Sequence, residues 1–191
     1  MTERRIRALA FAGSLRARSY NRALVRVAVA RAPEGLSVDV FDLRPLPLYD
    51  ADVESGGDPD PVADLKRAVR AAELVIIATP EYNQGVTAVT KNAVDWASRP
   101  PRPQAWDGKP VAIMGATPGR LGTVGAQRVL RESLGNLGAY VMPQPRLLLS
   151  GAAALFSDEL ELIDGPTLER VDGFLAAAAA WARRFVETVG Q

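Results

Sequence analysis

The sequence contains no cysteine and no histidine among its 191 residues. Without cysteine the chain has no disulfide, no thiolate nucleophile, and no iron–sulfur or cysteine–zinc site. Without histidine it lacks the commonest general base, a Ser-His-Asp triad and most zinc sites. An enzyme built from this chain must therefore use carboxylates with a hard metal ion, or a cofactor that brings its own chemistry.

An excess of charge of one sign and long apolar runs are also missing. The 23 Lys and Arg residues nearly balance the 22 Asp and Glu residues, so the net charge is +1. We therefore expect no nucleic acid and no membrane surface as a partner. No apolar run approaches the roughly 20 residues of a membrane span, and no signal-peptide pattern follows the N-terminus. We expect a cytoplasmic protein, and the length favours one domain over residues 1–191.

The stretch 13–21 separates a short apolar run, 6–11, from a helical periodicity over 22–32. This pattern predicts a turn from a buried strand into a helix. The turn is rich in small hydroxyl and amide side chains and carries two arginines, and the start of a helix favours an anion. The stretch therefore predicts a phosphate site. In the alternative interpretation, Ser19 is only a helix N-cap and Gly13 is only a turn residue.

Five apolar segments alternate with five helical segments along the chain. The strands are expected at 6–11, 36–43, 74–79, 111–116 and 140–149, the last interrupted by Pro143 and Pro145. Residues 44–60 are interpreted as a surface excursion. This alternation predicts the α/β class and a three-layer, flavodoxin-like sandwich. Its five-stranded parallel sheet would have the order 2-1-3-4-5.

Such a sheet binds ligands beyond the carboxyl ends of its strands, where strands one and three diverge. The loops expected there are 13–21, 80–85 and 117–123. They are the stretches richest in Gly, Ser, Thr and Asn, so the topology and the loop chemistry both favour a phosphorylated ligand.

Three motifs identify a family resemblance: GSLR-x-x-S-x-N over 13–21, TPEYN over 79–83 and KNAVDW over 91–96. Together they resemble the NADPH-dependent FMN reductase family, and in particular its chromate and quinone reductases. The resemblance extends from Arg5 to the last helix. It implies one non-covalent FMN per chain, NADPH or NADH as co-substrate, and a homodimer or homotetramer.

The resemblance also implies the residues of the site. Those that would hold the FMN phosphate are Ser14, Arg16, Ser19 and Asn21. Those that would line the isoalloxazine edge are Pro80, Glu81, Tyr82 and Asn83, with Thr117 and Gly119 completing the ring-side loop. No side chain is expected to act as a catalyst and no metal is expected, because the flavin N5 carries the chemistry.

Other polar residues near these motifs have more than one interpretation. Glu81 is interpreted as a solvated or backbone-anchoring carboxylate rather than a general acid, and Asp95 and Trp96 as packing and capping residues. Three arginines are candidates for the NADPH 2′-phosphate, with an ordinary solvated role as the alternative: Arg18, Arg102 and Arg120.

The segment 84–90, Gln-Gly-Val-Thr-Ala-Val-Thr, departs from the family pattern. The family usually places a Pro-Gly pair there, before Leu-Lys-Asn. The departure predicts a different start of the helix beneath the flavin, and it affects the substrate pocket more than FMN binding.

The function expected from these observations is FMN-dependent NAD(P)H oxidoreduction. The electron acceptors would be quinones, flavins, azo or nitro compounds, or chromate-like oxidants. The alternative is a non-enzymatic electron carrier of the flavodoxin type, although such carriers are typically acidic. A relative that has lost its flavin is a third possibility, which only the segment 84–90 supports.

Overall fold

A computed structural model describes residues 4–100 and 103–186 of the chain. Its main sheet is parallel and has the order β2-β1-β3-β6-β7, with β8 also pairing with β6. The strands are β1 (Ile6–Ala12), β2 (Leu36–Val40), β3 (Leu74–Ala78), β6 (Pro110–Ala116), β7 (Tyr140–Val141) and β8 (Leu147–Leu149). The predicted flavodoxin-like topology, 2-1-3-4-5, is confirmed.

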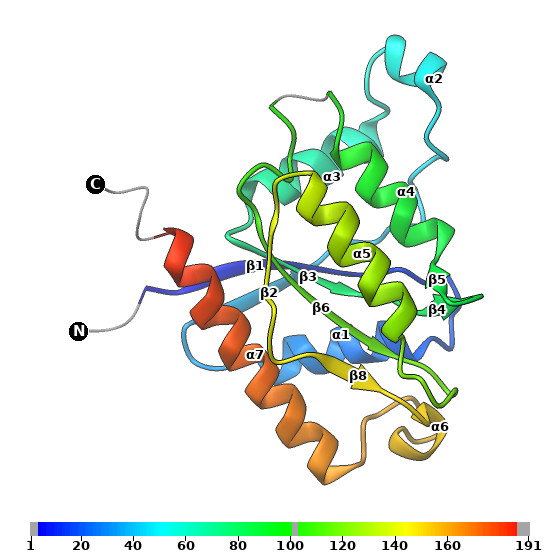
Figure 1. The fold of residues 1–191 in the computed structure, drawn as a ribbon, viewed down its shortest axis with the longest axis vertical. Coiled ribbons are helices and arrows are strands. Elements are labelled where there is room, and N and C mark those ends of the chain that lie inside the picture. The colour runs from blue at the N-terminus through cyan, green and yellow to red at the C-terminus, as the bar shows by residue number, and fades with distance from the viewer. Residues whose placement is uncertain (1–3, 101–102, 187–191) are drawn as a thin grey trace.

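Helices cover both faces of this sheet (Figure 1). One face carries α1 (Tyr20–Ala30) and α7 (Gly165–Val186), and the other carries α3 (Asp60–Ala71), α4 (Ala88–Ala97) and α5 (Val124–Asn136). Each face has its own cluster of buried apolar side chains. None of the helices in the described part of the chain is long and apolar enough to cross a membrane.

The position of β3 at the centre of the sheet explains why its sequence is uniformly apolar. All five of its residues, Leu74 to Ala78, are fully buried, because β1 and β6 flank the strand and helices cover both of its faces. Parallel strands in this position read as continuous apolar runs rather than alternating ones. By contrast, β2 at one edge is half exposed, as its alternating sequence predicts.

The fifth strand is divided by its two prolines, as the sequence indicates. β7 pairs with the beginning of β6, and β8 pairs with its end. The intervening prolines cannot donate to a sheet ladder, so they lie between the two short pairings.

Four short elements were not predicted: α2 (Ala51–Ser55), the hairpin strands β4 (Glu81–Tyr82) and β5 (Gly85–Val86), and α6 (Ala152–Leu155). Each has five residues or fewer, so none extends far enough for a hydrophobic period to appear.

The excursion 44–60, which includes α2, is fixed to α4. The Pro47 carbonyl accepts hydrogen bonds from Asn92 Nδ2 and Trp96 Nε1, each at 2.8 Å. Asn92 Oδ1 accepts in turn from the Tyr49 amide at 2.7 Å. The Tyr49 ring meets the Trp96 indole edge-to-face at 5.0 Å. Trp96 is fully buried, so its interpretation as a packing residue is confirmed.

Glu54 connects α2 to Arg99, the second residue after α4. Its carboxylate accepts from the Tyr49 hydroxyl at 2.9 Å and from Arg99 Nε at 2.9 and 3.1 Å. The Tyr49 hydrogen bond is the main cause that lowers the pKa of Glu54, burial opposes it, and Arg99 lowers the pKa further.

Glu54→Gln should lower thermal stability at pH 7, and the deficit should shrink in acid. The folded state lowers the pKa of Glu54 from 4.5, so its contribution is present above that value and is lost as pH falls through the folded pKa. Melting temperatures of both proteins from pH 7 to about pH 3.5 measure this. The substitution Glu161→Gln, at an exposed position, controls for the loss of one charge; a deficit independent of pH would contradict the prediction.

Candidate functional site

Three loops meet beyond the carboxyl ends of β1, β3 and β6, at the end of the sheet where the β4–β5 hairpin lies (Figure 1). The amide of Gly13 donates to the Ala78 carbonyl at 2.9 Å, which joins the loop after β1 to the end of β3. The amide of Thr79 donates to the Met114 carbonyl at 2.9 Å, which joins the end of β3 to β6. The predicted meeting of these loops is confirmed.

The loop 13–19 offers hydrogen-bond donors to an anion. The amides of Ser14, Leu15 and Arg16 donate to no acceptor among the described residues. The side chains of Ser14 and Ser19 lie within the loop, at 7% and 5% exposure, whereas Arg16 is exposed. Three successive unpaired amides, two hydroxyls and a cation before a helix suit a phosphate group.

Ser19 also caps α1. Its hydroxyl oxygen accepts from the Arg22 amide at 3.3 Å, so the N-cap interpretation is confirmed. Capping uses the oxygen as an acceptor and leaves the hydroxyl proton available to a ligand. The two interpretations of Ser19 are therefore compatible.

Asn21 holds the first turn of α1 to β6. Its Nδ2 donates to the Ala116 carbonyl at 2.8 Å, and its Oδ1 accepts from the Ala116 amide at 3.0 Å. Both ends of the buried amide are thus used by the main chain of one residue. Direct contact of Asn21 with a phosphate stays a prediction, and only its second Nδ2 proton is available for it.

The loop after β3 forms the tight β4–β5 hairpin. Asn83 and Gln84 at its tip have φ values of 52° and 59°, as a two-residue type I′ turn requires. Pro80 is buried before the hairpin, whereas Tyr82 is 60% exposed.

Glu81 fixes this hairpin to α5. Its Oε2 accepts from the Ala126 amide at 2.9 Å, within the first turn of the helix. A carboxylate is favourable there because the unpaired amides and the helix dipole are both positive. The interpretation of Glu81 as an anchoring carboxylate is confirmed.

The third loop, 117–123, is fixed to β8 and α6. The Thr117 amide donates to the Leu149 carbonyl at 2.9 Å, and the Thr117 carbonyl accepts from the Ala152 amide at 3.0 Å. The Thr117 hydroxyl accepts from the Gly119 amide at 3.2 Å. Thr117 and Gly119 are thus held at the same end of the sheet as the other two loops.

The three candidate arginines differ in their surroundings. Arg18 donates to the Asp158 carbonyl at 2.7 Å, so it connects the first loop to the segment before α7. Arg120 is exposed in the third loop. Arg102 lies outside the described residues.

Three threonines at the site lie in segments that the sequence singles out, but no role was predicted for them. Thr87 is the N-cap of α4, and its hydroxyl accepts from the Thr90 amide at 3.3 Å. Thr79 and Thr90 are fully buried beside it. A threonine followed three residues later by the first turn of an apolar helix is an N-cap pattern, so the position of Thr87 was readable from the sequence.

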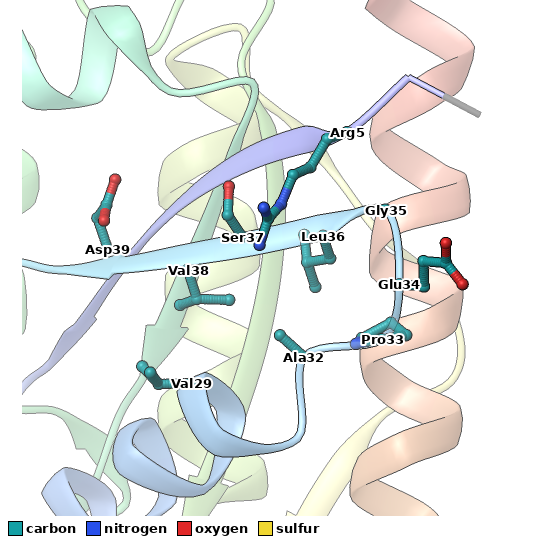
Figure 2. Close-up of a pocket in the computed structure, with 10 residues that line it drawn as sticks. All are labelled: Arg5, Val29, Ala32, Pro33, Glu34, Gly35, Leu36, Ser37, Val38 and Asp39. Atoms are coloured by element: carbon teal, nitrogen blue, oxygen red, sulfur yellow. The ribbon is translucent and has the colours of Figure 1, made fainter. Parts of the chain in front are cut away.

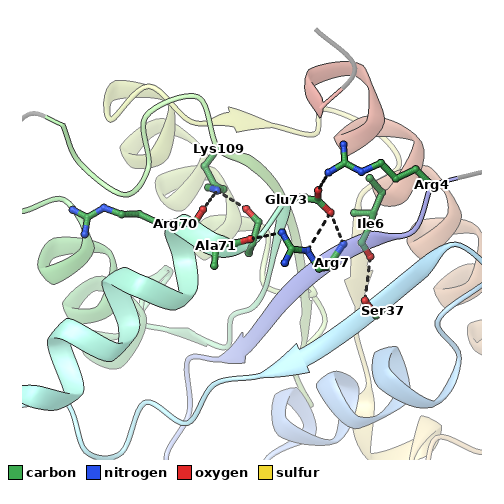
Figure 3. Close-up of polar contacts among 9 residues, drawn as sticks. Arg4, Ile6, Arg7, Ser37, Arg70, Ala71, Glu73 and Lys109 are labelled. Carbon is green, nitrogen blue, oxygen red and sulfur yellow. Dashed lines mark hydrogen bonds and ion pairs between the residues drawn. The ribbon is translucent and has the colours of Figure 1, made fainter. Parts of the chain in front are cut away.

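Two other features occupy the amino ends of the strands, away from these loops. A hollow of about 590 Å³ is lined by residues from the end of α1, the α1–β2 connection and β2. Figure 2 shows these residues, among them Val29, Glu34 and Val38. Figure 3 shows Glu73 accepting from Arg4 and from the Arg7 amide, the latter at 2.9 Å. Ligands of this sheet type bind at the carboxyl ends, so neither feature belongs to the candidate site.

Lys109, also drawn in Figure 3, caps the end of α3 by donating to the carbonyls of Arg70 and Ala72. Burial lowers the pKa of Lys109, and Glu73 opposes the effect. In the ranges 4–100 and 103–186, no group of three or more Asp or Glu residues is placed to hold a metal ion.

Comparison with known proteins identifies the family. The model of the NADPH-dependent FMN reductase family matches residues 6–154. The chain belongs to this family. It is therefore an FMN-dependent oxidoreductase that uses NAD(P)H.

Individual relatives match nearly the whole chain. An NAD(P)H-dependent FMN reductase of Pseudomonas aeruginosa is 41% identical over 94% of this chain and 96% of its own length. A quinone reductase of Escherichia coli is 38% identical, and the match covers 90% of this chain and 93% of that protein. Among solved structures, the flavoenzyme FerB, an NAD(P)H:(acceptor) oxidoreductase from Paracoccus denitrificans, has a TM-score of 0.86. It is 30% identical, and the match covers 94% of this chain and 98% of FerB.

The residues present fit FMN. The unpaired amides and hydroxyls of the first loop suit its phosphate, and the other two loops lie beside it at the same sheet edge. FMN supplies the redox chemistry when bound, so a chain without cysteine or histidine can be an oxidoreductase. The protein contributes the binding and orientation of the flavin.

Gly13→Ala should weaken FMN binding severely. A Cβ at this position would lie 1.7 Å from Thr90 Oγ1 and 3.0 Å from Thr90 Cβ, so the loop or the helix would have to move. FMN fluorescence titration of the flavin-free protein measures the loss, which we expect to exceed about tenfold, or about 1.4 kcal/mol. Gly173→Ala in α7 is the control for glycine replacement, because its φ is not positive and nothing lies within 4 Å of the added Cβ. Wild-type affinity in Gly13→Ala would contradict the expected clash.

Proposed function

We propose that the first loop binds the FMN phosphate and that the hairpin and third loop bind the isoalloxazine ring. The observation that carries this proposal is the set of unpaired amides at Ser14, Leu15 and Arg16, placed before a capped helix. The phosphate contacts come from Ser14, Arg16 and Ser19, with Asn21 fixing the helix start to β6. The ring contacts come from Pro80, Glu81, Tyr82, Asn83, Thr117 and Gly119.

We propose a quinone as the preferred class of acceptor. Relatives named quinone reductase or 2-hydroxy-1,4-benzoquinone reductase support it at 36–38% identity. NAD(P)H and one proton would then reduce the quinone to the hydroquinone.

We also propose a homo-oligomer located in the cytoplasm. Among the described residues, four large apolar side chains are at least 60% exposed: Ile163, which precedes α7, and the three residues Leu48, Tyr82 and Leu121. The last three lie on the loops that follow β2, β3 and β6, so all three belong to the same edge of the sheet. Contact between copies of the chain would bury these side chains. Size-exclusion chromatography with light scattering measures the molar mass and so tests for a dimer or tetramer. The cytoplasm would supply the NAD(P)H.

A spectroscopic titration tests the proposed activity. The FMN-loaded, desalted protein should show a flavin band that NADPH or NADH bleaches without oxygen, and a benzoquinone should restore it. A band that NAD(P)H leaves unchanged would indicate an electron carrier instead. A protein that takes up no flavin would refute the proposed site.

Arg16→Ala should weaken FMN binding about three- to tenfold and leave riboflavin binding unchanged, because riboflavin lacks the phosphate. A charge-assisted hydrogen bond at an exposed position is partly screened by water, which limits the loss. Fluorescence titration with both flavins measures the ratio. Arg26→Ala on the next turns of α1 is the matched control, and an equal loss for both flavins would argue against a phosphate contact.

A further inference from the structure

A buried chain of hydroxyl groups connects two of the three loops. Thr87 Oγ1 donates to the Gly13 carbonyl at 2.8 Å and lies 2.9 Å from Thr90 Oγ1. Thr90 Oγ1 lies 3.3 Å from Thr79 Oγ1, and the Thr79 hydroxyl donates to the Pro80 carbonyl at 2.9 Å. The chain thus runs from the main chain of the phosphate-side loop to that of the ring-side loop.

The number of hydroxyl protons determines which of these contacts are hydrogen bonds. Each threonine hydroxyl has one proton to donate. The protons of Thr87 and Thr79 are used on the carbonyls of Gly13 and Pro80. The one proton of Thr90 can therefore serve only one of its two hydroxyl neighbours. We place it on the shorter contact, where Thr90 donates to Thr87 at 2.9 Å, and the 3.3 Å contact between Thr90 and Thr79 is then not a hydrogen bond.

Burial and close packing hold the three threonine hydroxyls in this arrangement. All three threonines are at most 2% exposed, so an unpaired group there would cost more than one in water. Gly13 has no Cβ, which leaves the space that Thr90 Oγ1 occupies. The Gly13 peptide is also held from its other end, because its amide donates to Ala78.

We propose that Thr90, acting through Thr87, is a positioning residue for the FMN phosphate. It fixes the Gly13 carbonyl and thereby the orientation of the free amides at residues 14–16. This inference rests on the proposed phosphate site. Thr87 is the N-cap of α4 and Thr90 lies in its first turn, so hydroxyl groups fix the start of this helix.

The test compares Thr90→Ala with Thr90→Ser, because these two variants differ only in the hydroxyl. Dissociation constants for FMN and riboflavin are measured by flavin fluorescence on the flavin-free proteins. We expect Thr90→Ala to lose about tenfold in FMN affinity relative to riboflavin affinity. Thr90→Ser should keep the wild-type ratio to within about threefold, because it retains the hydroxyl.

Thr167→Ala is the control, since Thr167 is a buried threonine of α7 on the other face of the sheet. Its FMN-to-riboflavin ratio should equal that of the wild type. Equal losses for both flavins in Thr90→Ala, or no difference between Thr90→Ala and Thr90→Ser, would overturn the positioning role. If the wild-type protein binds both flavins equally well, the phosphate site itself is wrong and the inference falls with it.

Discussion

The close approach of three strand ends is the constraint on which the site depends. Thr79, at the end of β3, lies between Gly13 after β1 and Gly115 in β6. A Cβ on Gly13 would meet Thr90 Oγ1 at 1.7 Å, and one on Gly115 would meet the Thr79 carbonyl at 2.5 Å. Only glycine fits these two positions, because each lacks room for even a methyl group. The close packing at Gly13 and Gly115 thus holds the loops together without a ligand.

The sheet was predictable because its burial determines its residue types. The central strand β3 is covered on every side and reads as an unbroken apolar run, whereas β2 at the edge alternates. The helices α3 and α7 were equally readable from their apolar stripes. The conformation of the excursion 44–60 was not, because it depends on single hydrogen bonds from Asn92 and Trp96 to Pro47, which leave no periodic signal.

The site was predictable in composition and less so in detail. The residues of the proposed phosphate loop stood out because small polar side chains before a helix suit an anion, although the same side chains also suit an N-cap, as Ser19 does in α1. The pairing of Asn21 with Ala116 and of Glu81 with α5 could not be read from the sequence, because the paired residues are 95 and 45 positions apart. The left-handed turn at Asn83 and Gln84 was also hidden, since glutamine rarely marks such a conformation.

The arrangement of charges explains how such a site can serve an oxidoreductase. Glu81 is the one acidic residue in the three loops, and its carboxylate is already used on the α5 amide. With neither histidine nor cysteine in the chain, these loops lack the commonest general base and the thiolate nucleophile. Reactivity must come from the bound flavin. The protein's own effect on the rate is therefore exerted through position, and the hydrogen bonds that fix the loops to β3, α4 and α5 are its means of doing so.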